Sequence, residues 1–215
     1  MSLNHFKLFA MLVLSSFCLQ ATGDKVRNVL IIGDSISIGY TPFVERALAP
    51  DVLVAHNPGN GGSTVRGLEN VEKWLDNRQW DVILFNFGLH DLVYKDQQNK
   101  YDVVNGKVSV PLEEYKKNLE TIVSRLRETT ATLIFVTTTT VPENSPGRKV
   151  GDPAKYNQAA QEVMKKNGIE VVDLYTASLS IHPKNSKPGN VHYTPEGYQQ
   201  LANHIIETIN TALKK

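Results

Sequence analysis

Five short apolar runs rich in β-branched residues alternate with longer stretches of helical spacing, and this alternation restricts the possible folds most. Residues 26–32, 52–56, 82–87, 133–138 and 169–172 predict buried strands. The stretches near residues 42–49, 65–75, 112–129, 153–166 and 195–213 predict helices. Strands joined through helices form right-handed crossovers in a sheet that is covered on both faces. We therefore expect an α/β fold of three layers, α/β/α, with a five-stranded parallel sheet.

The first 23 residues have the pattern of a secretory signal peptide. A short basic end that contains Lys7 precedes an apolar run at residues 8–19, and Ala21 and Gly23 supply small residues for a cut after Gly23. The run is too short for a comfortable membrane span, which needs about 20 residues. We expect a secreted or periplasmic protein without a membrane span in its mature form. The alternatives are a cut after Ala21 and an uncleaved amphipathic anchor.

We expect the rest of the chain, residues 24–215, to be a single domain, because no repeat, low-complexity tract or linker divides it. The only cysteine, Cys18, lies inside the leader, so the mature chain has neither disulfides nor a thiol nucleophile. Lipid attachment at Cys18 is disfavoured by the large Phe17 before it.

The charge of the chain argues against binding to nucleic acid. Lys and Arg number 23 against 22 Asp and Glu, and removal of Lys7 with the leader balances the two counts. No basic run occurs, so the electrostatic footprint of a nucleic-acid or anionic-membrane binder is missing.

Two connections are longer than simple turns. Residues 92–111 contain Asn105-Gly106 between β-forming residues, which predicts a hairpin with a two-residue turn. Residues 141–152 are rich in Pro and Gly and predict a loop. Both follow the carboxyl end of a strand, the edge where open α/β sheets bind ligands. Arg148 and the nearby Tyr156 and Asn157 either line a cleft there or have surface and capping roles.

The first strand ends in Gly33-Asp34-Ser35. A glycine permits a tight turn here, and a helix that follows points its free N–H groups at the serine oxygen. The positive end of that helix stabilises developing negative charge. A serine that merely caps the helix is the simpler explanation of this tripeptide alone.

Three further polar segments follow later strands or precede the last helix. They are a glycine-rich turn at residues 57–64, a polar strand end at residues 86–91, and residues 190–198, in which His192 stands just before a helix start at Thr194-Pro195. Each segment alone has a structural explanation. Together with Ser35 they predict one site at the carboxyl edge of the sheet.

In this order the four segments resemble the sequence blocks of the GDSL (SGNH) hydrolases, a flavodoxin-like family of serine esterases. The resemblance covers nearly the whole mature chain and implies that Ser35 is the nucleophile and His192 the general base. It also implies an oxyanion hole formed by the N–H groups of Ser35 and Gly62, with Asp34 and Asp91 as supporting residues. It implies no cofactor and no metal, and a small-molecule or carbohydrate ester as the partner.

The sequence departs from the family pattern at two places. The third block usually reads Gly-x-Asn-Asp, and here His90 replaces the Asn that donates to the oxyanion; a neutral histidine also has one N–H donor. We expect Asp91 or a carbonyl group to set its tautomer. The acid that normally orients the catalytic histidine is also missing, because Gly189 and Asn190 stand in its place. The amide oxygen of Asn190 can accept from the ring, and Asp173 is a second candidate.

These observations support an exported serine esterase, with O-acetyl groups on carbohydrate as the substrate class. The first alternative is a catalytically impaired protein that binds carbohydrate or ester on the same fold, because the triad acid is missing. A lysophospholipase or thioesterase needs a long apolar groove, for which residues 92–111 offer few apolar side chains. Phosphate binding at Gly61-Gly62 lacks a supporting lysine, and the six histidines show no paired spacing for a metal.

Overall fold

The computed structural model describes residues 26–214, and the predicted signal peptide with Cys18 lies outside this range. A parallel sheet forms the centre, with the strand order β2-β1-β3-β6-β7. Its strands are β1 (Arg27–Ile32), β2 (Val52–His56), β3 (Val82–Phe85), β6 (Thr132–Val136) and β7 (Glu170–Val172). The expected five-stranded parallel sheet is confirmed.

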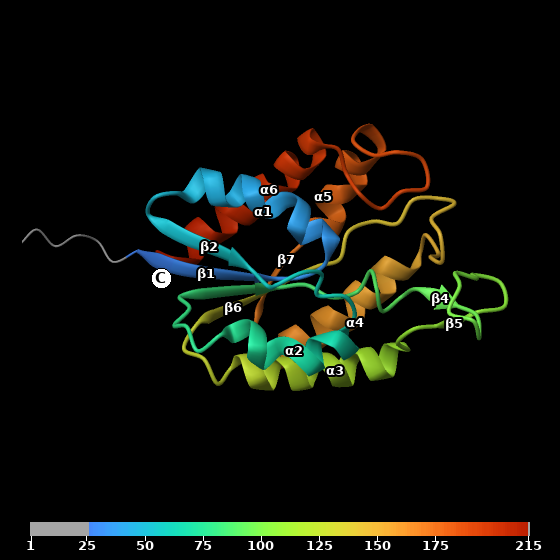
Figure 1. Ribbon diagram of the computed structural model, residues 1–215, viewed down its shortest axis with the longest axis horizontal. Coiled ribbons are helices and arrows are strands. Elements are labelled where there is room, and N and C mark those ends of the chain that lie inside the picture. The colour runs from blue at the N-terminus through green and yellow to red at the C-terminus, as the bar shows by residue number, and fades with distance from the viewer. Residues whose placement is uncertain (1–25, 215) are drawn as a thin grey trace, which may run out of the picture.

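Helices cover both faces of the sheet and complete the three layers (Figure 1). The helices α1, α5 and α6 lie on one face, and α2, α3 and α4 lie on the other. They span Ser35–Leu48 (α1), Thr64–Leu75 (α2), Leu112–Leu126 (α3), Asp152–Lys166 (α4), Leu174–Ile181 (α5) and Pro195–Ala212 (α6), and a short 3-10 helix, η1 (His182–Lys184), follows α5. None of the described helices has the length and apolar character needed to cross a membrane.

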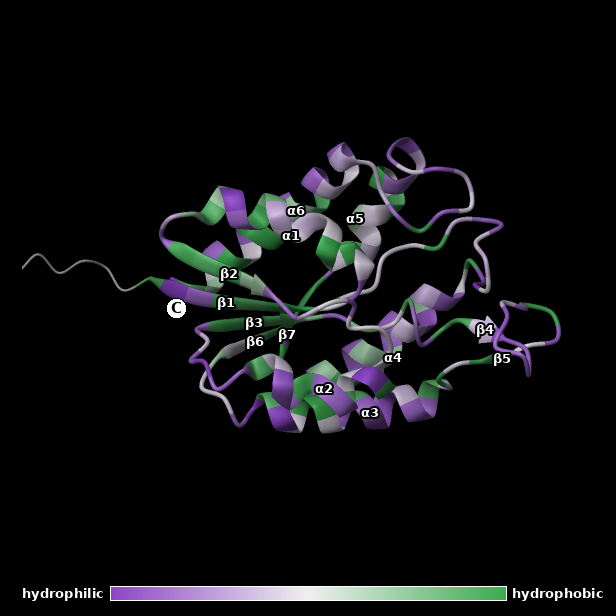
Figure 2. Ribbon diagram, in the orientation of Figure 1, coloured by the Kyte–Doolittle hydropathy of each residue, from purple (hydrophilic) through white to green (hydrophobic). Residues whose placement is uncertain are grey.

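The strands are buried because both faces of the sheet are covered. Every residue of β3, from Val82 to Phe85, is at most 1% exposed. Such strands need continuous apolar runs rather than alternation. Figure 2 shows hydrophobic strands at the centre and hydrophilic residues on the outer sides of the helices. The apolar runs therefore located the strands to within one or two residues at most ends.

The first helix differs from the prediction, because it begins at Ser35 rather than near residue 42. The β-branched residues Ile36 and Ile38 and a glycine at position 39 hide its helical pattern. Two contacts override these propensities. The side chain of Asp34 caps the helix by accepting from the N–H of Ile36, and Gly39 lies against the ring of Tyr198 so closely that a Cβ atom would be 2.2 Å from it.

The predicted hairpin turn at Asn105-Gly106 is wrong in detail. The short strands β4 (Tyr94–Lys95) and β5 (Lys107–Val108) do pair in antiparallel fashion, but eleven residues separate them. The carboxylate of Asp102 accepts from the N–H groups of Val104 and Asn105, both at 2.9 Å. This side chain folds the local chain into a turn of its own and moves Asn105-Gly106 away from the hairpin centre.

The loops after β1, β2, β3 and β6 meet at the carboxyl edge of the sheet. In Figure 1 this edge lies on the side of β4 and β5. The segment that precedes α6, near the C-terminal end of the sequence, reaches the same edge. The fold therefore brings together the four segments that the sequence singles out.

Candidate active site

Ser35 is the first residue of α1 and directly follows the turn after β1. The backbone N–H of Gly33 donates to the side chain of Asn57 at 2.8 Å, and the N–H of Gly61 donates to the carbonyl of Gly33 at 2.8 Å. A Cβ atom on Gly61 would lie 2.6 Å from that carbonyl oxygen, so only glycine fits. The glycine-rich loop after β2 thus braces the turn that presents Ser35. The helix places its free N–H groups beside the serine.

The structure brings Ser35, His192 and Asn190 together in one chain of hydrogen bonds. The Nε2 atom of His192 lies 2.8 Å from the Oγ of Ser35, and its Nδ1 atom lies 2.8 Å from the Oδ1 of Asn190. An amide oxygen only accepts, so Nδ1 carries the proton and Nε2 is free to accept from the serine hydroxyl. This arrangement is that of a general base held against a nucleophile.

The loop that carries Asn190 is held by a second histidine, which sequence reasoning missed. His182 is buried, and its Nε2–H donates to the backbone carbonyl of Asn190 at 2.7 Å. Its Nδ1 atom accepts from the hydroxyl of Ser186, and its ring packs edge-on against Tyr193. Burial lowers the pKa of His182, so the ring stays neutral and keeps this tautomer. Asn190 is therefore fixed through both its side chain and its backbone.

The expected oxyanion donors differ in whether their N–H groups are already hydrogen-bonded within the protein. The N–H of Ser35 lies in the first turn of α1, where it has no partner within the helix. The N–H of Gly62, by contrast, donates to the side-chain oxygen of Asn60 at 2.9 Å. Asn60 must release this group before it can bind a substrate oxygen. Sequence reasoning gave no sign of this contact, because it depends on the conformation of the loop.

His90 lies half-buried near the reactive pair. Burial lowers the pKa of its ring, as do the nearby charges of Arg148 and Lys95 and the ring of His192, whereas Asp34 raises it. The ring is therefore neutral at neutral pH and offers one N–H donor. No hydrogen bond within the described part of the chain occupies its side chain.

Asp91 does not set the tautomer of His90, contrary to one of the expectations. Its Oδ1 atom accepts from the N–H of Thr64 at 2.8 Å and from the Thr64 hydroxyl at 2.5 Å. These bonds fasten the end of the third block to the start of α2, and the Asp91 carboxylate is fully buried. This burial raises the pKa of Asp91 to about 7, and the charge of Asp34 adds to the effect.

Asp173, the second candidate for the missing acid, has a structural role. It caps α5, where its carboxylate accepts from the N–H and the hydroxyl of Thr176 at 3.0 and 2.6 Å. Tyr156 and Asn157 are also structural: the hydroxyl of Tyr156 donates to the carbonyl of Val110, and Asn157 bonds both backbone groups of Thr138.

A second serine–histidine contact lies behind the site. The Oγ of Ser37 is 2.7 Å from the Nε2 of His56, and the His56 Nδ1–H donates to the carbonyl of Asn57. Burial lowers the pKa of His56, so its ring is neutral. Ser37, however, is only 1% exposed. The pair joins β2 to α1, and a substrate cannot reach it.

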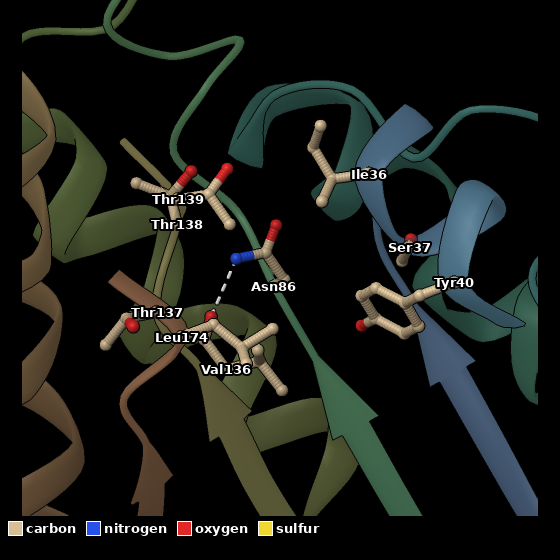
Figure 3. Close-up of a pocket in the computed structure, with 9 residues that line it drawn as sticks. All are labelled: Ile36, Ser37, Tyr40, Asn86, Val136, Thr137, Thr138, Thr139 and Leu174. Carbon is tan, nitrogen blue, oxygen red and sulfur yellow. Dashed lines mark hydrogen bonds between the residues drawn. The ribbon is translucent and has the colours of Figure 1, made fainter. Parts of the chain in front are cut away.

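One hollow borders the nucleophile segment, and another borders the loop that carries His192. The inner one has a volume of about 10 Å³, enough for one water molecule, and Figure 3 shows Asn86 in its wall, where its amide donates to the carbonyl of Val136. The outer one is a cleft of about 340 Å³ lined by His192, Asn190, Arg148 and Tyr101, among others. Only the outer cleft is large enough for a substrate.

Known proteins resemble this chain over most of its length. The model of the GDSL-like lipase/acylhydrolase family matches residues 31–200. An arylesterase of Vibrio mimicus is 21% identical over 204 residues, which cover 90% of this chain and 93% of the arylesterase. A solved lipase/acylhydrolase from Enterococcus faecalis superimposes with a TM-score of 0.69 at 23% identity, and the match covers 86% of this chain and 96% of that one. An acetylxylan esterase from Geobacillus stearothermophilus gives a TM-score of 0.68 at 17% identity, over 85% and 94% of the two chains.

Proposed function

The chain belongs to the GDSL-like lipase/acylhydrolase family of ester hydrolases, and from this premise we propose that Ser35, His192 and Asn190 hydrolyse a carboxylic ester. The observation that carries the proposal is the hydrogen-bonded chain from the Ser35 hydroxyl through the His192 ring to the Asn190 amide, 2.8 Å at each step. Family membership supports the reaction class, and this geometry supports the assignment of the roles.

The reaction begins when the Oγ of Ser35 attacks the ester carbonyl while the Nε2 of His192 takes the serine proton. The tetrahedral oxyanion then accepts from the N–H of Ser35, from His90 and, once Asn60 has released it, from the N–H of Gly62. Collapse breaks the bond to the alcohol, which leaves with the proton from His192. Water attacks the acyl-enzyme with the same base, and this step releases the acid and restores the Ser35 hydroxyl.

We propose O-acetyl groups on carbohydrate as the substrate class. Two solved relatives in the same fold are named as acetylxylan esterases, and this supports the choice. The hollow behind Ser35 holds only about one water molecule, so the protein offers no deep tunnel for a long acyl chain there. A short acyl group and a polar alcohol in the open cleft fit this arrangement better than a lipid.

A second candidate is a protein that binds esters without turning them over. The amide of Asn190 stands where a carboxylate would stabilise the protonated histidine, and Asn60 occupies the N–H of Gly62. Both features lower catalytic power without preventing binding.

Covalent labelling tests the two candidates. We expect the Oγ of Ser35 to displace p-nitrophenolate from an ethyl p-nitrophenyl phosphonate and to form a phosphonate ester, which mass spectrometry of the peptides locates. Ser37 is the internal control, because it also contacts a histidine but is buried. An unlabelled Ser35 in folded protein favours the non-catalytic candidate, and a label on Ser37 contradicts the assignment of the nucleophile.

We also propose that the protein is exported. The apolar run at residues 8–19 and the small residues Ala21 and Gly23 support this proposal. N-terminal sequencing of the protein recovered outside the cytoplasm should begin at Asp24 or Thr22. Retention of residues 1–21 in the cytoplasmic fraction would contradict it.

A further inference from the structure

The cleft beside His192 has a wall that the proposed chemistry does not use. Tyr101 comes from the segment between β4 and β5, and Arg148 comes from the loop before α4. His192 and Asn190 line the same cleft of about 340 Å³. A group bound against Tyr101 and Arg148 is therefore beside His192, whose ring contacts the Ser35 hydroxyl.

Arg148 has hydrogen-bonding capacity that the protein leaves open. Its Nε–H donates to the carbonyl of Leu89 at 2.9 Å, and its Nη1 donates to the carbonyl of Pro146 at 3.3 Å. A guanidinium group has five N–H donors, so about three remain for a ligand. The two carbonyls fix the orientation of the group, which lowers the entropy cost of binding an anion.

Among the described residues, Arg148 forms no ion pair, although the charge of Asp34 acts on it from a greater distance. The ion pairs of the described residues join other groups, and no carboxylate among them lies within 4.0 Å of this guanidinium. The side chain is half-buried, and this burial lowers its pKa. Lys95 adds positive charge on the same side, since both cations lower the pKa of His90. A partly desolvated cation without a partner is a site for an anion.

Tyr101 gives the cleft an exposed aromatic face. Its side chain is among the large apolar groups left in water, with the residue 58% exposed. One side of the ring lies against Gly147, where a Cβ atom would be 2.7 Å from the ring, and the positive φ of +69° at Gly147 also favours glycine. The backbone thus braces the ring. A braced, exposed aromatic ring packs well against the flat apolar face of a sugar.

We propose that Tyr101 and Arg148 form a binding subsite for an acidic sugar unit next to the scissile ester. Tyr101 stacks on the sugar ring, and the guanidinium of Arg148 binds its carboxylate or sulfate group. The proposal rests on the carbohydrate-ester function proposed above and narrows it to acidic glycans. It assigns Arg148 a role in specificity and no role in the covalent steps.

Binding of unacetylated oligosaccharides tests the subsite without any need for turnover. We expect calorimetry in a Ser35→Ala background, which lacks the nucleophile that could hydrolyse a methyl ester, to show that the protein binds trigalacturonate at least tenfold more tightly than its methyl ester, which has the same backbone without charge. Arg148→Gln should remove this difference, and Arg148→Lys should keep part of it. Tyr101→Ala should weaken both ligands by a similar factor. A sulfated trisaccharide in parallel shows whether sulfate is the preferred anion.

The matched control is Lys149→Gln, which removes the same charge one residue away. The amine of Lys149 lies over the ring of Tyr94, 4.0 Å from its centre, and Lys149 is exposed. The preference for the acidic ligand should survive in this variant. Equal affinity for acid and ester when Arg148 and Lys149 are both present, or an equal loss in the Lys149 and Arg148 variants, would overturn the subsite.

The same experiment separates this proposal from the esterase proposal. If p-nitrophenyl acetate is hydrolysed through Ser35 but the acidic ligand has no advantage, the subsite fails and the esterase stands. If the acidic ligand binds through Arg148 and no ester is hydrolysed, the subsite stands in a binding protein. Hydrolysis of acetylated trigalacturonate and its methyl ester then shows whether the preference appears in KM.

Discussion

At the scale of single residues, Asn190 determines how this site differs from a Ser-His-Asp triad. Its amide oxygen accepts both from the ring of His192 and from the backbone N–H of His192, at 2.8 and 3.0 Å. It therefore fixes the tautomer that the base needs. A neutral amide cannot compensate the positive charge that His192 acquires when it takes the serine proton.

Replacement of Asn190 by Asp should raise activity. A hydrogen bond to a charged group contributes about 1.5–3 kcal/mol against about 1 kcal/mol for a neutral one, so we expect kcat to rise roughly 10-fold. Asn190→Ala should lower it, because the ring loses its orientation. Steady-state hydrolysis of p-nitrophenyl acetate measures both. Asn203→Asp, at an exposed position in α6, controls for the added charge, and no change in Asn190→Asp would contradict this role.

His90 is expected to act as an oxyanion donor in place of the family's asparagine. Loss of one such donor typically lowers kcat by about 10²–10³-fold, which is the effect expected of His90→Ala. His90→Asn should recover activity to within about tenfold, since an amide N–H can fill the same role. His204→Ala, at an exposed position in α6, is the matched control. A His90→Ala enzyme with full kcat would exclude the assignment.

At the scale of elements, the sequence predicted the strands and helices whose formation depends on a local pattern of residues. Buried parallel strands need continuous apolar runs, and these are visible without a structure. The start of α1 was misplaced because a cap by Asp34 and packing of Gly39 against Tyr198 outweigh the local propensities. The short helix α5 was not predicted. It has only eight residues, several of them Ser or Thr, and this is too few for a clear helical pattern; its start depends on the cap by Asp173.

The candidate site likewise has features that the sequence predicted and features that it did not. The strand end and the helix start predicted that these segments meet at one edge of the sheet, and the roles of Ser35, His192 and Asn190 were expected from the family resemblance. The contact between Asn60 and Gly62 and the hydrogen bonds of His182 were not predicted, and the position of Arg148 in the cleft was one of two alternatives. These depend on loop conformations and on contacts between residues far apart in the chain, for which the sequence has no periodic signal.

The glycine-rich loop lies so close to the turn before α1 that a methyl group added at Gly61 should destabilise the fold. Gly61→Ala places a Cβ atom 2.6 Å from the carbonyl oxygen of Gly33, a backbone atom that cannot move aside alone. We expect a loss of about 1–3 kcal/mol in the free energy of unfolding and a lower kcat, since the turn presents Ser35. Gly151→Ala, where a Cβ meets open space, should be neutral or slightly stabilising. Thermal unfolding compares them, and equal melting temperatures would refute the close approach.

At the scale of the whole molecule, the buried Asp91 makes the free energy of unfolding depend on pH. Its pKa is raised from 3.8 to about 7 in the folded protein, so folding favours the protonated form. Its contribution to the free energy of unfolding is therefore fully present below about pH 4 and is lost as the pH rises through 7. The slope is at most about 1.4 kcal/mol per pH unit.

Asp91→Asn should remove this dependence. The amide oxygen can still accept from Thr64, and the difference in unfolding free energy between the original protein and the variant should shift in favour of the variant from pH 5 to pH 8. Urea unfolding at the two pH values measures the shift, and other titrating groups cancel in the comparison. Asp51→Asn, at an exposed position, is the control. A constant difference would show that Asp91 titrates normally.

The whole architecture serves to bring a hydroxyl, a histidine and an amide from distant segments to one edge of a sheet. Ser35 and His192 are 157 residues apart in sequence and 2.8 Å apart at their reacting atoms. The sheet and its two helix layers fix this distance, because both residues stand at helix starts on the same face, in α1 and before α6.

The most direct test of the account is hydrolysis of p-nitrophenyl acetate by residues 24–215, measured beside Ser35→Ala. We predict turnover that depends on Ser35 and falls in the variant to the rate of buffer alone, while the variant keeps the melting temperature of the original protein. Hydrolysis at the same rate in both proteins would contradict the assignment of Ser35 as the nucleophile.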